Sequence, residues 1–257
     1  LPLNINELGT GKVTFKFSGS NDMSKAEFYP SQYVKVVAAA QVGTKVCGSL
    51  QDAVVAANDG ETVKVLADVN MTTANFVTQV DGYATLVNVA GKAVTIDLNG
   101  KKVTVNAAHA DLNGKAKSNM LMSVFHADPN GTLTLTDSSS EGTGTVELFA
   151  NDATVYGLIV SENANDKTNP GKIIVNGGNY IADKLSDSMI FADINEVITV
   201  NGGNFRLGNV GTGDNGKPWI FNTTGQNQIH INVNGGTYND NVAKQHWTYE
   251  VNLGEGL

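Results

Sequence analysis

The sequence predicts an all-β solenoid of about six coils, preceded by a short α-helix that covers its first coil. Three observations support this prediction: a string that recurs almost unchanged, an alternation of apolar and polar residues in each copy, and a single segment with helical periodicity. The chain has 257 residues, which is enough for one large all-β domain.

The recurring string is "IIVNGGNY" at 173–180, "ITVNGGNF" at 198–205 and "INVNGGTY" at 231–238. Related runs begin at Val63, Val94 and Leu133, so that the copies are 25 to 40 residues apart. No helical pattern separates them. A variable period of this kind is typical of solenoid coils whose corner loops differ in length.

A second set of apolar pairs lies 7 to 13 residues before the recurring strands, and each repeat therefore holds at least two strands. The pairs are Leu86-Val87, Val124-Phe125, Ile159-Val160, Ile190-Phe191 and Ile220-Phe221.

Alternation within each copy predicts which face of the strand is buried. Ile198 and Val200 lie on one face, which we expect to fill the interior, and Thr199 lies on the other. The outward threonines fit a flat recognition surface, but the preference of threonine for strands is the favoured explanation.

The "NGG" strings predict a corner between two sheets. Their glycine pairs permit positive φ where the chain turns. Strands of successive coils repeat every ~4.8 Å, so equivalent side chains stack. We expect an amide ladder and, four residues further along, an aromatic stack; the residues are Asn176, Asn201 and Asn234, then Tyr180, Phe205 and Tyr238.

The helical segment runs from Ser49 to Asn58. Leu50, Ala53, Val54 and Ala57 recur at helical spacing, and Ser49 is a suitable N-cap. A helix here would cover apolar side chains and unpaired strand edges at the end of the solenoid.

The two ends of the chain lack the repeat. Residues 1–33 include the alternating run "KVTFKF" and are expected to be an N-terminal β extension or the end of a preceding module, whereas 34–257 form the solenoid domain, with a turn at Gly43. The chain begins at Leu1, and "HWTYEVNLGEGL" ends within its pattern. We therefore expect a processed or truncated piece of a longer protein.

The segments "SLQDAVVAANDGETVKVLADV", "VTIDLNGKKV", "GTLTLTDSSSEGTGTV" and the "VNGGNF" strings together resemble the right-handed parallel β-helix, or pectate-lyase-like, repeat regions of secreted bacterial cell-surface proteins. The resemblance covers roughly residues 34–245. It implies a right-handed parallel β-helix and an extracellular or cell-surface location. Such regions occur in adhesin-like proteins, most of which have no assigned activity.

Charge and composition restrict the partners. A formal charge of -8 and a pI near 4.9 argue against nucleic acid and anionic membrane surfaces. No apolar stretch reaches the ~18 residues of a membrane span, so no membrane insertion is expected. Cys47 is the sole cysteine and is interpreted as a small buried apolar residue rather than a nucleophile.

Enzymes of this fold would need a catalytic constellation. The repeat alignment places Ile181 beside Arg206 and Asp183 two positions away, which favours a surface ion pair over a lyase base. The densest acidic group is expected in solvated turns, although a hydrolase would need two of its carboxylates; it comprises Asp183, Asp187, Asp193 and Glu196. The four histidines, His109, His126, His230 and His246, are scattered. No metal site or cofactor is predicted.

Glycan binding requires fewer specialised groups than catalysis does, chiefly exposed aromatic rings with amides and carboxylates nearby. The candidates are Trp219, Trp247 and Tyr249. Trp219 shares the strand pattern of Ile220 and Phe221, so a place in the core or in an end cap is the alternative.

The function predicted from these observations is a non-catalytic extracellular β-helix module that acts as a stalk, spacer or adhesin and contacts host or microbial glycans. One alternative is a polysaccharide lyase or glycoside hydrolase. Another is a structural subunit that assembles through its solenoid ends, where strand edges are open.

Overall fold

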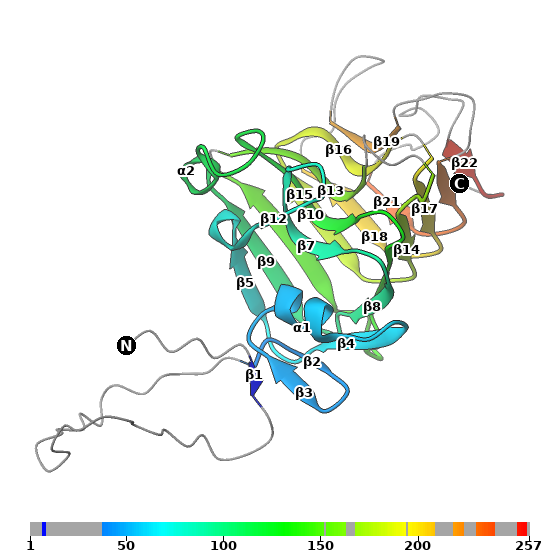
Figure 1. Cartoon of the computed structure of the whole chain (residues 1–257). Coiled ribbons are helices and arrows are strands. Elements are labelled where there is room, and N and C mark those ends of the chain that lie inside the picture. Colours follow the sequence, from blue (N-terminus) through cyan, green and yellow to red (C-terminus); the bar gives the residue numbers. More distant parts are fainter. Residues whose placement is uncertain are drawn as a thin grey trace, which may run out of the picture.

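The structure is a computed structural model that describes residues 7–8, 38–151, 153–162, 168–193, 195–208, 218–223, 230–239 and 251–255. The described strands form three sheets of 10, 6 and 6 strands, here named sheets A, B and C. The N-terminal elements lie at one end of the molecule and the last strands at the other (Figure 1).

Sheet A is parallel from β4 onward, and its first three strands pair antiparallel. In spatial order its strands are β1 (Glu7–Leu8), β3 (Lys45–Cys47), β2 (Ala40–Val42), β4 (Glu61–Val65), β8 (Ala93–Asp97), β11 (Thr132–Thr136), β14 (Lys172–Val175), β17 (Val197–Val200), β20 (Ile231–Val233) and β22 (Val251–Leu253).

Sheet B is parallel throughout. Its order is β21 (Thr237–Tyr238), β18 (Asn204–Leu207), β15 (Asn179–Asp183), β12 (Thr145–Ala150), β9 (Lys102–Ala107) and β5 (Val69–Thr72). Sheet C is parallel except for the antiparallel pair of β6 and β7. Its order is β19 (Trp219–Thr223), β16 (Leu185–Ala192), β13 (Thr154–Ser161), β10 (Met120–Ala127), β7 (Ala84–Val89) and β6 (Val77–Thr78).

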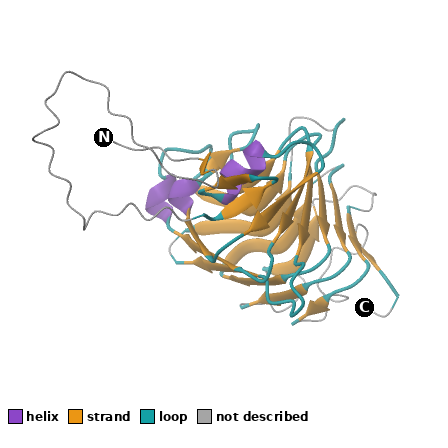
Figure 2. Ribbon diagram, turned by 90° about the horizontal axis from the view of Figure 1, so that it is seen from below, coloured by secondary structure: helices purple, strands orange, loops and turns teal. Residues whose placement is uncertain are grey.

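The chain visits the three sheets in turn. It runs from β8 in sheet A to β9 in sheet B and β10 in sheet C, and then returns to sheet A as β11. Figure 2 shows the resulting strands stacked side by side along the molecule, with loops at their ends. Each turn therefore carries three strands, and the strands of sheet B are the ones that the two apolar registers of the sequence did not reveal.

The predicted alignment of the sheet A strands is confirmed with one exception. Leu133 pairs with Val94 and Ile173, and Ile198 pairs with Ile173 and Ile231. In the first copy the alignment is wrong by two residues, because Val63 pairs with Ile96 and Glu61 with Val94. An even offset preserves the buried face, so that the error does not show in the hydrophobic pattern.

The predicted interior is confirmed. Leu133, Ile173 and Ile198 are fully buried, whereas Thr134 and Thr199 on the opposite face are partly exposed. Burial of each aliphatic side chain stabilises the fold by about 1.5–3 kcal/mol. Cys47 is also fully buried, as the interpretation of an apolar thiol requires.

The helix before the first coil is confirmed as α1 (Leu50–Ala56), which is shorter than the predicted segment. Its N-cap is Ser49, whose hydroxyl oxygen accepts a hydrogen bond from the Asp52 amide at 3.0 Å. Leu50, Ala53 and Val54 are buried against neighbouring strands that include β2 and β7. The turn at Gly43 joins β2 to β3, whereas the predicted strand "KVTFKF" lies outside the described residues.

Two short helical segments lie beside the long strands. They are η2 (Thr73–Asn75), a 3₁₀ turn after β5, and α2 (His109–Leu112) between β9 and β10. Thr73 Oγ1 lies 2.8 Å from the Ala108 carbonyl oxygen and 2.7 Å from Asp111 Oδ2, which ties the two segments together.

The "NGG" corners join sheet A to sheet B. The Asn201 amide donates to Asn176 Oδ1 and the Asn234 amide donates to Asn201 Oδ1, both at 2.9 Å. Phe205 stacks between Tyr180 and Tyr238 with ring centroids 5.1 and 5.2 Å apart.

Only the second glycine of each corner has a positive φ, at Gly178, Gly203 and Gly236. The first glycine is closely packed in two of the three corners: a Cβ on Gly202 would lie 3.0 Å from the Asn176 carbonyl oxygen, and one on Gly235 would lie 2.6 Å from the Asn201 carbonyl oxygen, whereas Gly177 has room for a Cβ. The prediction of positive φ is therefore confirmed for the second glycine of each pair and wrong for the first.

Candidate functional site

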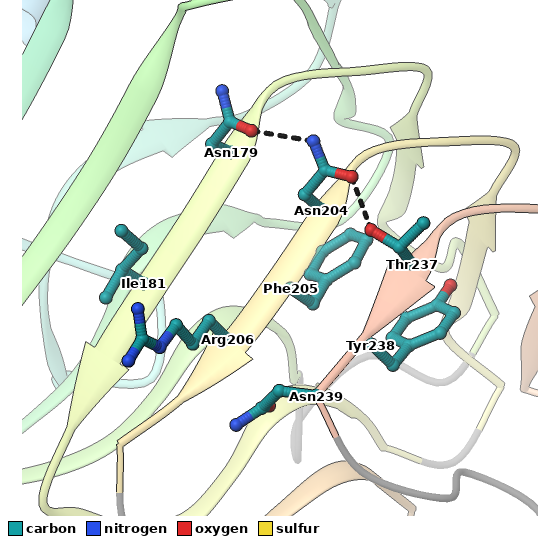
Figure 3. Close-up of a pocket in the computed structure, with 8 residues that line it drawn as sticks. All are labelled: Asn179, Ile181, Asn204, Phe205, Arg206, Thr237, Tyr238 and Asn239. Carbon is teal, nitrogen blue, oxygen red and sulfur yellow. Dashed lines mark hydrogen bonds between the residues drawn. The ribbon is translucent and has the colours of Figure 1, made fainter.

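The outer face of sheet B carries rows of polar side chains that run across its strands. In one row, the Asn204 amide of β18 donates to Asn179 Oδ1 of β15 at 2.7 Å, and the Thr237 hydroxyl of β21 donates to Asn204 Oδ1. Figure 3 shows this row along one side of a groove. The row exists because parallel strands in register place equivalent outward side chains one strand spacing apart.

A second row contains the arginine. Glu147 pairs with Ile181, and Ile181 pairs with Arg206, so the predicted neighbour of Arg206 is confirmed. Lys102, which lies in the neighbouring row, forms an ion pair with Glu147. The predicted ion pair between Arg206 and Asp183 is not formed, and the exposed guanidinium makes no hydrogen bond or ion pair with the described residues.

A third row holds an exposed aromatic ring. Phe149 of β12 is 39% exposed and lies between Asn106 and Asp183, its partners in the adjacent strands. The sequence analysis did not select this residue, although a signal was present. In "TVELFA", Val146 and Leu148 occupy the buried phase, which places Phe149 on the outside.

The groove at the C-terminal part of this face has a volume of about 330 Å³. We name it the Arg206 groove; its lining residues are Asn179, Ile181, Asn204, Phe205, Arg206, Thr237, Tyr238 and Asn239 (Figure 3). The lining combines one cation, amide groups and apolar surface, which is the mixture that small polar ligands require.

The three predicted aromatic candidates do not meet at this groove. Trp219 is the first residue of β19 in sheet C and is only 5% exposed, which argues against a glycan-contacting role and favours the alternative of a packed residue. Trp247 and Tyr249 lie outside the described residues.

The outer face of sheet C differs sharply, because polar and titratable groups are buried there. His126 is fully buried; its Nδ1 lies 3.1 Å from Asn88 Oδ1 and its Nε2 lies 3.0 Å from the Glu162 carbonyl oxygen. The Asn88 amide donates to Asp128 at 2.6 Å. Burial lowers the pKa of His126 to about 4 and raises the pKa of Asp128.

Two of the acids that were expected in solvated turns are buried instead. Asp187 and Glu196 are each 1% exposed, so that expectation is wrong for them. Burial raises the pKa of Glu196 to about 8, although the Ser161 hydroxyl donates to its Oε2 at 2.8 Å. Burial, reinforced by Asp193 and Asp81, raises the pKa of Glu162 to about 7.

Among the described residues, the buried acids and histidines do not form a metal site. In the part of the chain that the structure describes, no three His, Cys, Asp or Glu side chains are arranged to hold a metal ion. His230 lies apart from His126, with its Nδ1 3.1 Å from the Glu196 carbonyl oxygen. His109 begins α2, and His246 lies outside the described residues.

Within the described ranges, no helix is long and apolar enough to cross a membrane. Comparisons with protein-family models, with curated proteins and with solved structures find no match to this chain. The resemblance to β-helix repeat regions therefore stays a prediction from the residues.

Proposed function

We propose that sheets A, B and C close into a right-handed parallel β-helix of about six coils, as expected for repeated parallel crossovers. The order in which the chain visits the sheets supports this proposal, as does the parallel pairing along each sheet. Such a helix would be a stiff rod, because each coil is hydrogen-bonded to the next along all three sheets.

On this rod we propose a non-catalytic function: the protein is a spacer or adhesin-like module that contacts glycans through the outer face of sheet B. The observation that carries the proposal is the exposed ring of Phe149, which lies in register with polar rows on the same face. Sugar rings stack on aromatic faces, while neighbouring amides and charges bond their hydroxyls. An extracellular or cell-surface location, in bacteria as the resemblance suggests, follows from this function.

The first test is a glycan-array screen with the full chain, run beside a polysaccharide-degradation assay. The proposal predicts binding to at least one glycan class without product release. Appearance of reducing ends or unsaturated products would replace it with the lyase or hydrolase alternative, and absence of binding on the whole array would remove the glycan role.

The second test uses the Phe149→Ala variant, which we expect to lose roughly tenfold in affinity for a glycan that the wild-type protein binds, because a stacking surface is removed. Val55→Ala is the matched control: Val55 is 67% exposed, but on α1. Equal affinities of the two variants would contradict the assignment of the face. Val55→Ala should leave thermal stability nearly unchanged, whereas Phe149→Ala removes a ring that is more than half covered and should lower it modestly.

A second candidate function, end-to-end assembly, is favoured by one feature. Strands β22, β21 and β19 are the last described strands of sheets A, B and C, and lie toward the same end of the molecule (Figure 1). Open strand edges can pair with another chain. Sedimentation at increasing protein concentration should then show growing particles, whereas a constant monomer mass would contradict assembly.

A further inference from the structure

The three sheets end differently at the N-terminal end of the molecule. In sheet A the strand β4 pairs with the antiparallel strand β2, and in sheet C the strand β7 pairs with the antiparallel strand β6. Sheet B instead ends at β5, which pairs with β9 on one side and with no described strand on the other (Figure 1). The outer edge of β5 therefore offers backbone N–H and C=O groups to a further strand.

A groove of about 710 Å³ lies beside this edge. We name it the β5 groove; its lining comes from Ala38 and Ala39 before β2, from Gly48 after β3, and from residues 66–70, which lead from β4 into β5. Most of these side chains are small and apolar. The main contacts of α1 are with β2, β3, β4 and β7, which belong to sheets A and C. The groove is therefore a mostly apolar surface beside a strand edge that no described strand covers.

The chain enters the described structure at this groove, because Ala38 is part of the lining. The antiparallel ladder of β2 and β4 leads to the same place. Ala40 pairs with Val65, and beyond this pair the Leu66 amide donates to the Ala39 carbonyl oxygen at 3.0 Å. Each residue back from β2 thus faces one residue further on from β4. Continued in the same way, the ladder leads onto the outer edge of β5.

Residues 34–37, "VKVV", lie outside the described residues, but their sequence has the pattern that this edge requires. Counting on from the end of the ladder gives three facing pairs: Val36 with Val69, Lys35 with Asn70, and Val34 with Met71. In β5, Met71 is buried and Asn70 is exposed. Facing residues of paired strands lie on the same side of a sheet, so that the two valines would be inside and the lysine outside.

We propose that residues 34–37 add an antiparallel strand to the outer edge of β5, fill the β5 groove and complete the cover of the N-terminal end. The occupant is this segment, because a segment joined directly to the groove has a far higher effective concentration there than a second copy has. Charge complementarity supports the choice, since Lys35 would lie diagonally from the exposed Asp68. This inference goes beyond the proposed function and does not depend on glycan binding.

The first test is a disulfide trap in the full chain. Lys35→Cys with Asn70→Cys places cysteines at facing outward positions, where Cα atoms about 4.5–5.5 Å apart suit a disulfide. We expect mild oxidation to link them within one chain, while the fully buried Cys47 stays a free thiol. Lys35→Cys with Thr104→Cys is the matched control. Thr104 faces Asn70 from β9 and would lie two strand spacings from residue 35, roughly 9–10 Å, which is too far for a disulfide.

Linkage to the same extent in the two double variants, or linkage in neither, would overturn the proposal. Linkage between two chains, seen as a dimer on a non-reducing gel, would assign the β5 groove to a second copy and would overturn it as well.

The second test measures hydrogen exchange of those β5 amides that do not bond to β9, again in the full chain. Val36→Asp puts a charge on the inner side of the added strand, and we expect exchange of these amides to become at least about tenfold faster. Lys35→Gln, on the outer side, is the control and should change the exchange by less than about twofold. Exchange that is equally fast in the wild-type protein and in both variants would show that the edge is unpaired, and would overturn the proposal.

Discussion

Sheets B and C are built from the same coils, yet their outer faces have opposite characters. Sheet B exposes its polar side chains in open rows, including Arg206 and the ring of Phe149. Sheet C buries polar groups such as His126 and Asp128. The difference shows that one repeat pattern yields both an exposed polar face and a buried polar layer.

The comparison is most sharply tested by Glu196, whose pKa of about 8 is raised by burial. Below the unfolded pKa of about 4.5 both states are protonated, and as pH rises toward 8 only the unfolded state ionises, so that folding stability is lost. Glu196→Gln should therefore be more stable than wild type at pH 9, on the order of 3 kcal/mol, with little difference near pH 4. Urea unfolding at the two pH values measures this, and a difference independent of pH would contradict the buried acid.

A smaller effect is expected from breaking the buried network at Asn88. Asn88→Ala leaves Asp128 and His126 without their shared amide partner, and we expect a loss of about 2 kcal/mol in unfolding free energy. Asn204→Ala breaks the row on sheet B, where water can replace the lost bonds, and should cost less than about 1 kcal/mol. Equal losses in the two variants would show that the two faces do not differ in burial.

The smallest effect concerns Asp137, at the corner that leads into sheet B. Partial burial opposes its ionisation, but hydrogen bonds from the amides of Gly100 and Gly144 and from Ser139 outweigh it and lower its pKa. Its contribution is present above the ordinary pKa of an aspartate and is lost as pH falls through the lowered value. Asp137→Asn should thus be less stable than wild type at pH 7, by about 1 kcal/mol or less, and this deficit should shrink in acid. A deficit that grows on acidification in thermal melts would contradict this assignment.

Much of the fold could be predicted because burial in a solenoid follows a period of two along each strand. The alternation predicted that Ile198, Val200 and their equivalents are buried. The repeat predicted the asparagine and aromatic stacks. The two-residue offset at Val63 could not be seen, since an even shift leaves the same residues inside.

The site was less accessible to sequence reasoning, for two reasons. Phe149 could have been found by extending the alternation to the third strand of each turn, where Val146 and Leu148 occupy the buried phase. The burial of Asp187 and Glu196 could not be predicted from the sequence, because it depends on packing between segments far apart in the chain. A carboxylate beside a strand end looks the same in sequence whether it is covered or solvated.

The central claim, that the outer face of sheet B contacts glycans, is tested most directly by hydroxyl-radical footprinting of the full chain with and without a bound glycan. Three exposed apolar residues serve as internal reporters: Phe149 on sheet B, Val55 on α1 and Val80 in the loop next to Asp128. We predict that the glycan protects Phe149 and leaves Val55 and Val80 unchanged. Protection of Val80 without protection of Phe149 would contradict the claim and move the contact to the face of sheet C.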